Sequence, residues 1–369
     1  MIAQMACWLA VSLTGQDHFY PPVFLVTPPN APAQLYYQDT KEPFEPARES
    51  PKKFGEDKQP WQFPWMVAGF SHVAGDPIGK DLKFRVYSQE QKGNRAVQVT
   101  RMLLRLWTLN VERLRLIHNP RYHGGLVDVF LCFGGKAGGE QLFDQELGRD
   151  SITGKDVIYD ANTIYIYDMP SFTDPVEMAR EIAHEYGHAT WPPKGGFKEP
   201  EEWSDGYLAE KVYLRWIRDA LANNTLTPDD VMGATKAGLD KWIATNVDPL
   251  VMNASQIQPT TELLADKSKA GMNAFIGLAV YLETIYPASV FARSMKLGTY
   301  EAKDYPPAAV LAAEEPDQIT LKIPASLSGK SLWIPLGTGK ISGAKILKSD
   351  PNGWVQIQPT GSVVITNVH

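Results

Sequence analysis

One stretch of the chain, residues 174–193, constrains the fold more than any other. It reads DPVEMAREIAHEYGHATWPP and carries the signals of a single capped helix. Asp174 can act as the N-cap, Pro175 suits the first helical position, and Glu177 fits a capping box. The alanines favour the helix, and the WPP at 191–193 ends it. The sequence therefore predicts one helix between these two boundaries.

Two histidines lie four residues apart within this predicted helix. That spacing places His184 and His188 on one face, so both imidazoles can reach a single metal ion. Glu185 falls beside them, close enough to hydrogen-bond a water on that ion without being a ligand. The same pattern also arises by chance in helices that carry surface histidines. The two histidines alone therefore leave a zinc site and an ordinary helix as alternatives.

A third ligand has to come from elsewhere, because a catalytic zinc ion has three protein ligands and one open position. The segment EEWSDGYLAE, which begins at Glu201, supplies four acids. If a helix begins at Pro200, Glu201 and Asp205 share one face of it. Glu201 and Glu202 also fit as acids that favour a helix N-terminus, and Glu210 lies on a compatible face. Glu201 ranks first as the ligand, then Glu202, with Asp205 or Glu210 behind.

With this second motif the chain resembles the gluzincin peptidases of the peptidase-MA type, in which a ligand glutamate is followed four residues later by an aspartate. The two residues before that aspartate are commonly aromatic and then small, as Trp203 and Ser204 are here. By position, the resemblance implies that Glu201 is the third ligand of one Zn²⁺ ion. It implies that Asp205 orients a ligand histidine through the other ring nitrogen. The resemblance spans about residues 96–297.

The resemblance extends to a strand and a helix outside the two motifs. NTIYIYD, at 162–168, occupies the place of a strand with an exposed edge, to which a substrate peptide can add. The segment 268–287 is similar to the buried C-terminal helix of these peptidases. Related enzymes use a tyrosine or histidine to stabilise the oxyanion, but this chain has Asn273, Ala274 and Phe275 where the tyrosine is expected. Four residues are available as substitutes, each with a core or surface role as its alternative: Tyr281, Tyr286, Tyr207 and His123.

The pattern along the chain predicts an α+β protein. Four parts are expected: an apolar start (1–16), a proline- and aromatic-rich region with short strands (17–95), a zincin-like domain with an active-site helix and a helical C-terminal subdomain (96–312), and a small all-β domain (313–369). Further helices are expected at 96–119, 200–223, 227–246 and 268–287.

Strands are expected at 83–91, 126–135 and 162–170. The glycine-rich run GGKAGGE that follows the second of these is expected to be a flexible turn, because its spacing fits no phosphate-binding loop. In the third strand Ile164 and Ile166 alternate with Tyr165 and Tyr167, which predicts two different faces.

Charge and the length of the apolar segments bear on the partners and the location of the protein. A net charge of −6 and the lack of a long basic run argue against a nucleic-acid partner, and no segment is long enough to span a bilayer. The apolar start around Cys7 resembles the core of a secretory signal, which predicts a secreted or periplasmic protein. The alternative is that the apolar start is a buried N-terminal strand and that the protein is cytoplasmic. Removal of the start would leave Cys132 without a disulfide partner. The oligomeric state is left open.

Together these patterns predict a zinc metallopeptidase acting on a peptide or protein. Zinc would lower the pKa of its water towards about 7 and polarise the carbonyl, while Glu185 would carry the proton to the leaving amine. One alternative is a catalytically silent, exported zincin-fold protein that binds a glycan or a protein. Another is a zinc amidase acting on cell-wall amides. Glu185 argues against the silent scaffold, which needs no acid between its ligands.

Overall fold

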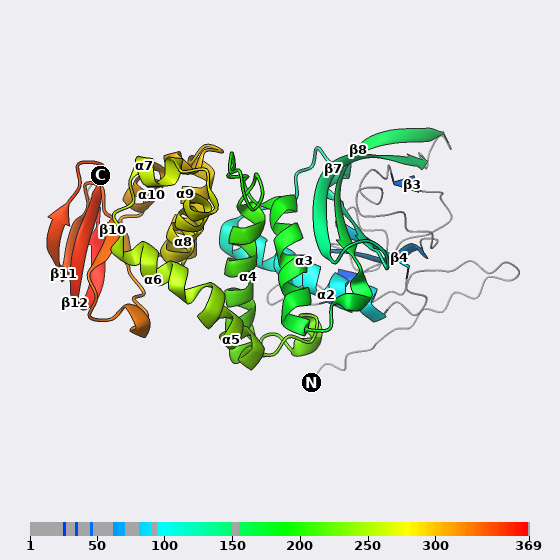
Figure 1. Ribbon diagram of the computed structural model, residues 1–369, viewed down its shortest axis with the longest axis horizontal. Coiled ribbons are helices and arrows are strands. Elements are labelled where there is room, and N and C mark those ends of the chain that lie inside the picture. Colours follow the sequence, from blue (N-terminus) through cyan, green and yellow to red (C-terminus); the bar gives the residue numbers. More distant parts are fainter. Residues whose placement is uncertain are drawn as a thin grey trace, which may run out of the picture.

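The computed structural model describes residues 25–26, 34–35, 45–46, 62–70, 81–89, 94–149 and 155–367. The predicted signal segment, 1–16, and most of the predicted N-terminal region, 17–95, lie outside the described residues. Within them the chain is α+β: a mixed sheet lies at one end, helices fill the middle, and a smaller sheet lies at the other end (Figure 1). No helix of this part is both long and apolar enough to cross a membrane.

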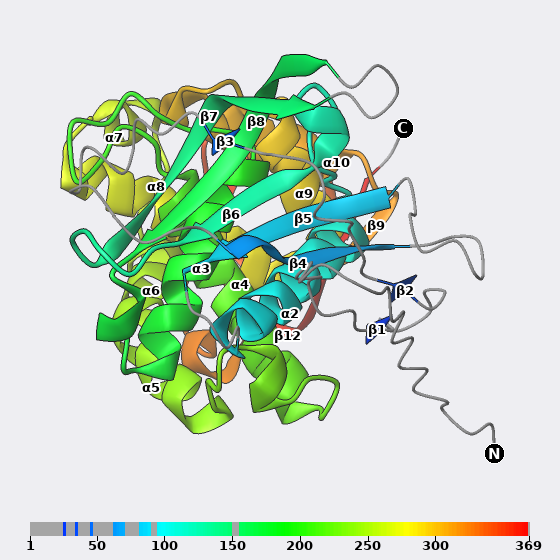
Figure 2. The same cartoon turned by 90° about the vertical axis from the view of Figure 1, so that its right-hand side faces the viewer.

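The larger sheet has six strands in the order β3-β7-β8-β6-β5-β4. Its inner strands β5, β6 and β8 are parallel, whereas β4 and β7 run antiparallel to their neighbours. Figure 2 looks onto this sheet, with helices behind it. The bounds are β3 Glu45–Pro46, β4 Gln62–Phe70, β5 Asp81–Ser88, β6 Val127–Leu131, β7 Gly138–Arg149 and β8 Asp156–Tyr167; the separate pair is β1 Leu25–Val26 and β2 Gln34–Leu35.

The alternation in β8 has the consequence expected from the sequence. Ile164 and Ile166 belong to the main core, which also contains the apolar faces of the neighbouring helices. Tyr165 and Tyr167 point to the other face, into a second cluster that includes Phe130. Successive side chains of a strand alternate between its faces, so one strand contributes to two separate clusters.

The exposed edge is on a different strand from the one the sequence indicated. β8 is paired along both sides, with β6 and with β7, so the expectation of an exposed edge at 162–168 is wrong. The glycine-rich run is also more than a turn, because β7 begins at Gly138 within it. β3 covers only Glu146 and Leu147 of β7. Among the described strands of this sheet, the N-terminal half of β7 therefore has an open edge, at the opposite end of the sheet from β4.

Helices form the middle of the molecule, with α3 and α4 side by side next to the sheet (Figure 1). Their bounds are α2 Asn94–Leu109, α3 Pro175–Thr190, α4 Asp205–Ala222, α5 Lys236–Asn246, α6 Asp248–Gln256, α7 Thr261–Ala265, α8 Lys269–Ile285, α9 Ala288–Leu297 and α10 Tyr305–Glu314. The helix expected at 268–287 is α8, and most of its side chains are buried.

Three expected helices differ from the structure in their extent or continuity. The helix expected at 96–119 stops at Leu109 and continues as a π-helical turn, Asn110–Leu114, which ends where Arg115 turns left-handed (φ 53°). The helix expected at 227–246 is divided into a 3₁₀ turn, Pro228–Asp230, and α5. The helix expected from Pro200 begins only at Asp205.

The last part of the chain forms the smaller sheet, as its turn-rich alternation indicates. The strands β9 Gln318–Thr320, β10 Leu332–Pro335, β11 Lys340–Ser349 and β12 Trp354–Thr366 are all antiparallel, with β12 in the centre. Trp354 donates its ring N–H to Pro306 O, and the Tyr286 hydroxyl donates to Pro335 O at 2.6 Å. The apolar core runs on from the helices into this sheet without a break.

Candidate metal centre

The helix that carries the histidines is capped largely as its sequence predicts. The Asp174 side chain accepts from the backbone N–H of Val176 at 2.8 Å, and Pro175 is the first helical residue. Glu177 does not complete the expected capping box, because its carboxylate pairs with Arg180 at 2.9 Å. This end of α3 is therefore fixed by one side-chain cap and an ion pair.

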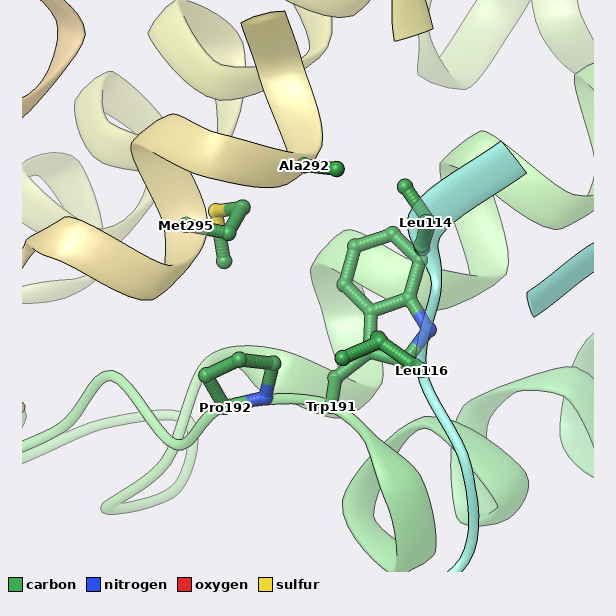
Figure 3. A pocket seen from close by; sticks show the side chains of 6 residues that line it. All are labelled: Leu114, Leu116, Trp191, Pro192, Ala292 and Met295. Carbon is green, nitrogen blue, oxygen red and sulfur yellow. The ribbon is translucent and has the colours of Figure 1, made fainter. Parts of the chain in front are cut away.

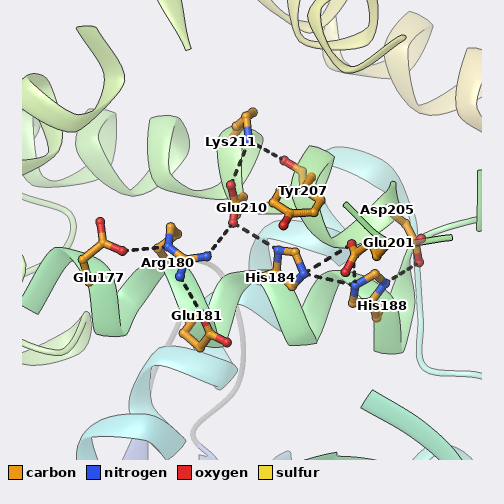
Figure 4. Close-up of polar contacts among 10 residues, drawn as sticks. All are labelled: Glu177, Arg180, Glu181, His184, His188, Glu201, Asp205, Tyr207, Glu210 and Lys211. Carbon is orange, nitrogen blue, oxygen red and sulfur yellow. Dashed lines mark hydrogen bonds and ion pairs between the residues drawn. The ribbon is translucent and has the colours of Figure 1, made fainter. Parts of the chain in front are cut away.

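Three ligand atoms converge between α3 and the segment before α4 (Figure 4). The two Nε2 atoms of His184 and His188 are 3.2 Å apart. Glu201 Oε1 is 3.5 Å from the first and 3.3 Å from the second. Ligand atoms about 2.0–2.1 Å from a tetrahedral zinc ion are about 3.3–3.4 Å from one another, which is close to all three separations.

The polar atoms of this triangle fit a metal better than they fit each other. Glu201 Oε1 is buried and makes no hydrogen bond of normal geometry within the described part of the chain, although both imidazoles are near. Buried oxygens are rarely left in this state. Two imidazoles and a carboxylate are also a donor set that zinc commonly takes. The residues present therefore fit one zinc ion.

Each histidine has a carboxylate at its other ring nitrogen. His188 Nδ1 is 3.3 Å from Asp205 Oδ2, and His184 Nδ1 is 3.1 Å from Glu210 Oε2. Such a partner makes Nδ1 the protonated nitrogen and leaves the Nε2 lone pair for a metal. Asp205 thus lies where the resemblance places it. Glu210 contacts the side of His184 away from the triangle, so it is not placed as a ligand.

Glu201 reaches the triangle from a loop, not from a helix face. The loop 191–204 leads from α3 to α4, and its exposed Glu202 is not part of the cluster. Lys194 is buried and donates to the carbonyls of Gly298 and Thr299. Ser204 donates its backbone N–H (2.8 Å) and its hydroxyl (2.7 Å) to Lys194 O. These bonds fix both sides of Glu201 and delay the start of α4.

Charges in the metal-free cluster displace several pKa values. Burial alone would lower the pKa of His188, but hydrogen bonds to Asp205 and Glu201 outweigh it and raise that pKa to about 10. The pKa of His184 is also raised, by Glu201 and Glu210 against the effect of burial. Burial would raise the pKa of Glu201, yet the two imidazolium neighbours lower it to about 2. Without a metal, the cluster therefore holds protons at neutral pH.

Glu185 has the environment of a general base. It is buried next to the histidines, and its Oε2 has no hydrogen-bond partner within the described residues. Burial, its largest influence, raises the pKa to about 7, while the charges of His184 and His188 act in the opposite direction. A carboxylate with a pKa near neutral pH can both take and return a proton.

Two glycines that the sequence interpretation did not single out shape the centre. A Cβ at Gly139, on the open half of β7, would lie 2.5 Å from Glu185 Cγ. A Cβ at Gly206 would lie 2.4 Å from Nε2 of His188 and 2.8 Å from that of His184. The run GGKAGGE and the DG pair that starts α4 were the available signals. Only the tertiary contacts give these glycines their roles.

The four candidates for oxyanion stabilisation are widely separated. Tyr207 is the one whose ring contacts a centre residue within the described chain: its centroid is 4.6 Å from that of His184, edge to face. Tyr281 is fully buried in α8, and Tyr286 is bound to Pro335 O beside the smaller sheet. His123 lies in a 3₁₀ turn, and its side chain is outside the described residues.

Two cavities in the described part lie away from this centre. One is an apolar pocket of ≈ 10 Å³ behind Trp191, between Leu114 and Met295, with room for about one water molecule (Figure 3). The other, of ≈ 420 Å³, is an apolar groove along α6, α7 and α8. Neither is lined by His184, His188, Glu201 or Glu185.

Comparisons of the chain with known protein families, with curated proteins and with solved structures found no match. The function is therefore inferred from the geometry of this centre.

Proposed function

We propose that this protein is a zinc-dependent peptidase of the gluzincin type, with a zincin-like domain built from the larger sheet and the helices beside it. The observation that carries the proposal is the triangle of His184, His188 and Glu201, beside which a buried carboxylate oxygen of Glu185 has no hydrogen-bond partner within the described residues. A purely structural zinc site is usually closed by four ligands and has no use for such an acid.

Each residue of the centre has its own proposed role. His184, His188 and Glu201 would hold one zinc ion, which would supply Lewis acidity for a carbonyl and for an attacking water. Glu185, whose Oε2 has no hydrogen-bond partner within the described residues, would accept the proton of the attacking water and return it to the leaving amine. Tyr207 is the proposed donor to the oxyanion, because its ring lies against His184.

The substrate would lie along the open half of β7. Gly139 brings this strand against Glu185, so a peptide added to its edge would pass next to the general base. Because β7 runs antiparallel to β8 and has no long partner on its other side in the described chain, its backbone groups there are available for pairing. An extended peptide or protein segment is therefore the proposed substrate class.

Metal content and peptide cleavage, measured together, test the proposal. Wild type should bind one zinc per chain and cleave members of a mixed peptide library. Glu185→Gln should keep the zinc and lose about 10²–10⁴-fold in rate, the usual contribution of a general base. His184→Ala should lose both. Zinc binding without cleavage of any peptide would favour the silent binding protein, and cleavage of wall amides but not peptides would favour the amidase.

A further inference from the structure

Arg180 lies one helical turn before His184, on the same face of α3. It contacts three carboxylates, at 2.9 Å from Glu177, 2.6 Å from Glu181 and 3.1 Å from Glu210 (Figure 4). The first two acids belong to α3 itself. Glu210 belongs to α4 and is the acid that contacts a ligand histidine.

Glu210 is held at both of its oxygens. Its Oε2 contacts Arg180 Nη1 and His184 Nδ1, each at 3.1 Å. Its Oε1 accepts from Lys211 Nζ at 2.8 Å. The side chain is only 4% exposed, and a carboxylate at such a depth remains charged and fixed only when cations and hydrogen bonds surround it.

The partner of the second histidine lacks this arrangement. Asp205 contacts His188 Nδ1 through Oδ2, while its Oδ1 is buried and has no hydrogen-bond partner in the part of the chain described. No ion pair of Asp205 with an arginine or lysine is found there either. The two imidazoles are therefore oriented by carboxylates held in different ways.

We propose that Arg180 is a positioning residue of the metal centre, acting on His184 through Glu210. The guanidinium fixes Oε2 of Glu210 opposite Nδ1, which sets the plane of the imidazole and directs Nε2 to the triangle. Lys211 holds the other oxygen and prevents the carboxylate from turning. The inference rests on the zinc site of the proposed function, but not on peptidase activity.

A structural role for Arg180 is the competing explanation, since the same contacts join α3 to α4. The two explanations differ in what they predict for zinc. A structural contact changes the stability of the metal-free protein, with no special effect on metal affinity. A positioning residue changes zinc affinity, and it does so only while Glu210 can transmit the effect.

The test compares zinc dissociation constants, from competition with a chelator, for the full chain and its variants. Arg180→Ala should weaken binding about 10–100-fold, the usual cost of losing a group that orients a metal ligand. Arg180→Lys should recover part of the loss. Arg215→Ala is the matched control, because Arg215 also joins α4 to a partly buried glutamate, Glu283 of α8, but away from the metal centre. It should change affinity less than about threefold.

A double-mutant cycle then distinguishes the two explanations. In a Glu210→Gln background, Arg180→Ala should have almost no further effect on zinc affinity. Stability in chelator is measured for every variant, and Arg180→Gln replaces Arg180→Ala if the latter does not fold. Unchanged zinc affinity in Arg180→Ala, or the same loss with and without Glu210, would overturn the inference alone. A wild type that binds no zinc would overturn the proposed site as well.

Discussion

At the scale of single residues, the centre depends on one small position as much as on its ligands. Gly206 faces both imidazoles, and any side chain there would meet their Nε2 atoms. A Cβ at residue 206 would therefore displace at least one of the two imidazoles from its position in the triangle. A motif that consists of ligands alone would not include this glycine.

We expect Gly206→Ala to reduce zinc affinity strongly while leaving the chain folded. The added methyl would have to displace one imidazole, because its three nearest neighbours are ring atoms, two of His188 and one of His184, not flexible chain ends. Gly361→Ala is the control, because a Cβ there meets nothing within 4 Å. Equal zinc affinity in the two variants, measured by titration, would contradict the arrangement of the triangle.

Zinc binding should depend steeply on pH, because a metal competes with protons for the imidazoles. The pKa of His188 is raised to about 10 and that of His184 is also raised, so at neutral pH both carry a proton that zinc must displace. Affinity should therefore rise with pH between about 6 and 9, by about tenfold per unit for each proton released.

The stability of the metal-free protein should instead fall as pH rises. A group whose pKa is higher in the folded chain contributes stability that is complete below its unfolded pKa, and that stability is lost as pH rises through the folded value. For His188 this window runs from about 6.5 to about 10. Unfolding of the metal-free protein, measured in chelator at a series of pH values, gives this loss of stability.

A zinc affinity that does not change with pH would contradict the protonated state of the metal-free centre.

At the scale of elements, the loop 191–204 connects α3 to α4 and carries Glu201, the proposed third ligand. Its position depends on Lys194, whose ammonium group binds two carbonyls after α9, and on Ser204, which binds the carbonyl of Lys194. The chain thus uses a distant helix end to place Glu201 beside α3. The resemblance to a two-motif peptidase predicted that Glu201 lies beside the two histidines, but not this support.

Lys194→Met should loosen the loop and weaken zinc binding by about tenfold, with the histidines still in place. The apolar replacement keeps the length of the side chain but leaves the carbonyls of Gly298 and Thr299 without their donor. Lys236→Met, which removes an exposed ion pair with Asp240, should leave zinc affinity unchanged. If both variants bound zinc as wild type does, Lys194 would have no part in placing Glu201.

At the scale of the whole molecule, the sequence predicted those features that depend on neighbouring residues. Asp174 and Pro175 define the start of α3 by local chemistry, and the alternation around Ile164 gave the two faces of β8. The start of α4 was missed because it depends on Ser204 binding Lys194 across the loop. The edge strand β7 was missed because glycines that favour a turn also allow close approach to Glu185.

In the metal centre, too, some features follow from neighbouring residues and others from tertiary contacts. His184 and His188 follow from helix periodicity, and their distance is set within one element. Whether Glu210 lies at Nε2 or at Nδ1 of His184 depends on how α4 packs on α3, which no local pattern contains. Gly187 contributes to that packing, since a Cβ there would lie 2.4 Å from Ala209 Cβ.

Anomalous diffraction from crystals of the zinc-loaded protein would show whether His184, His188 and Glu201 hold one zinc ion, as we propose. We expect one anomalous peak per chain at the zinc edge, about 2.0–2.2 Å from both Nε2 atoms and from Oε1 of Glu201. A peak held by other residues, or a protein that takes up zinc with no peak in this triangle, would contradict it.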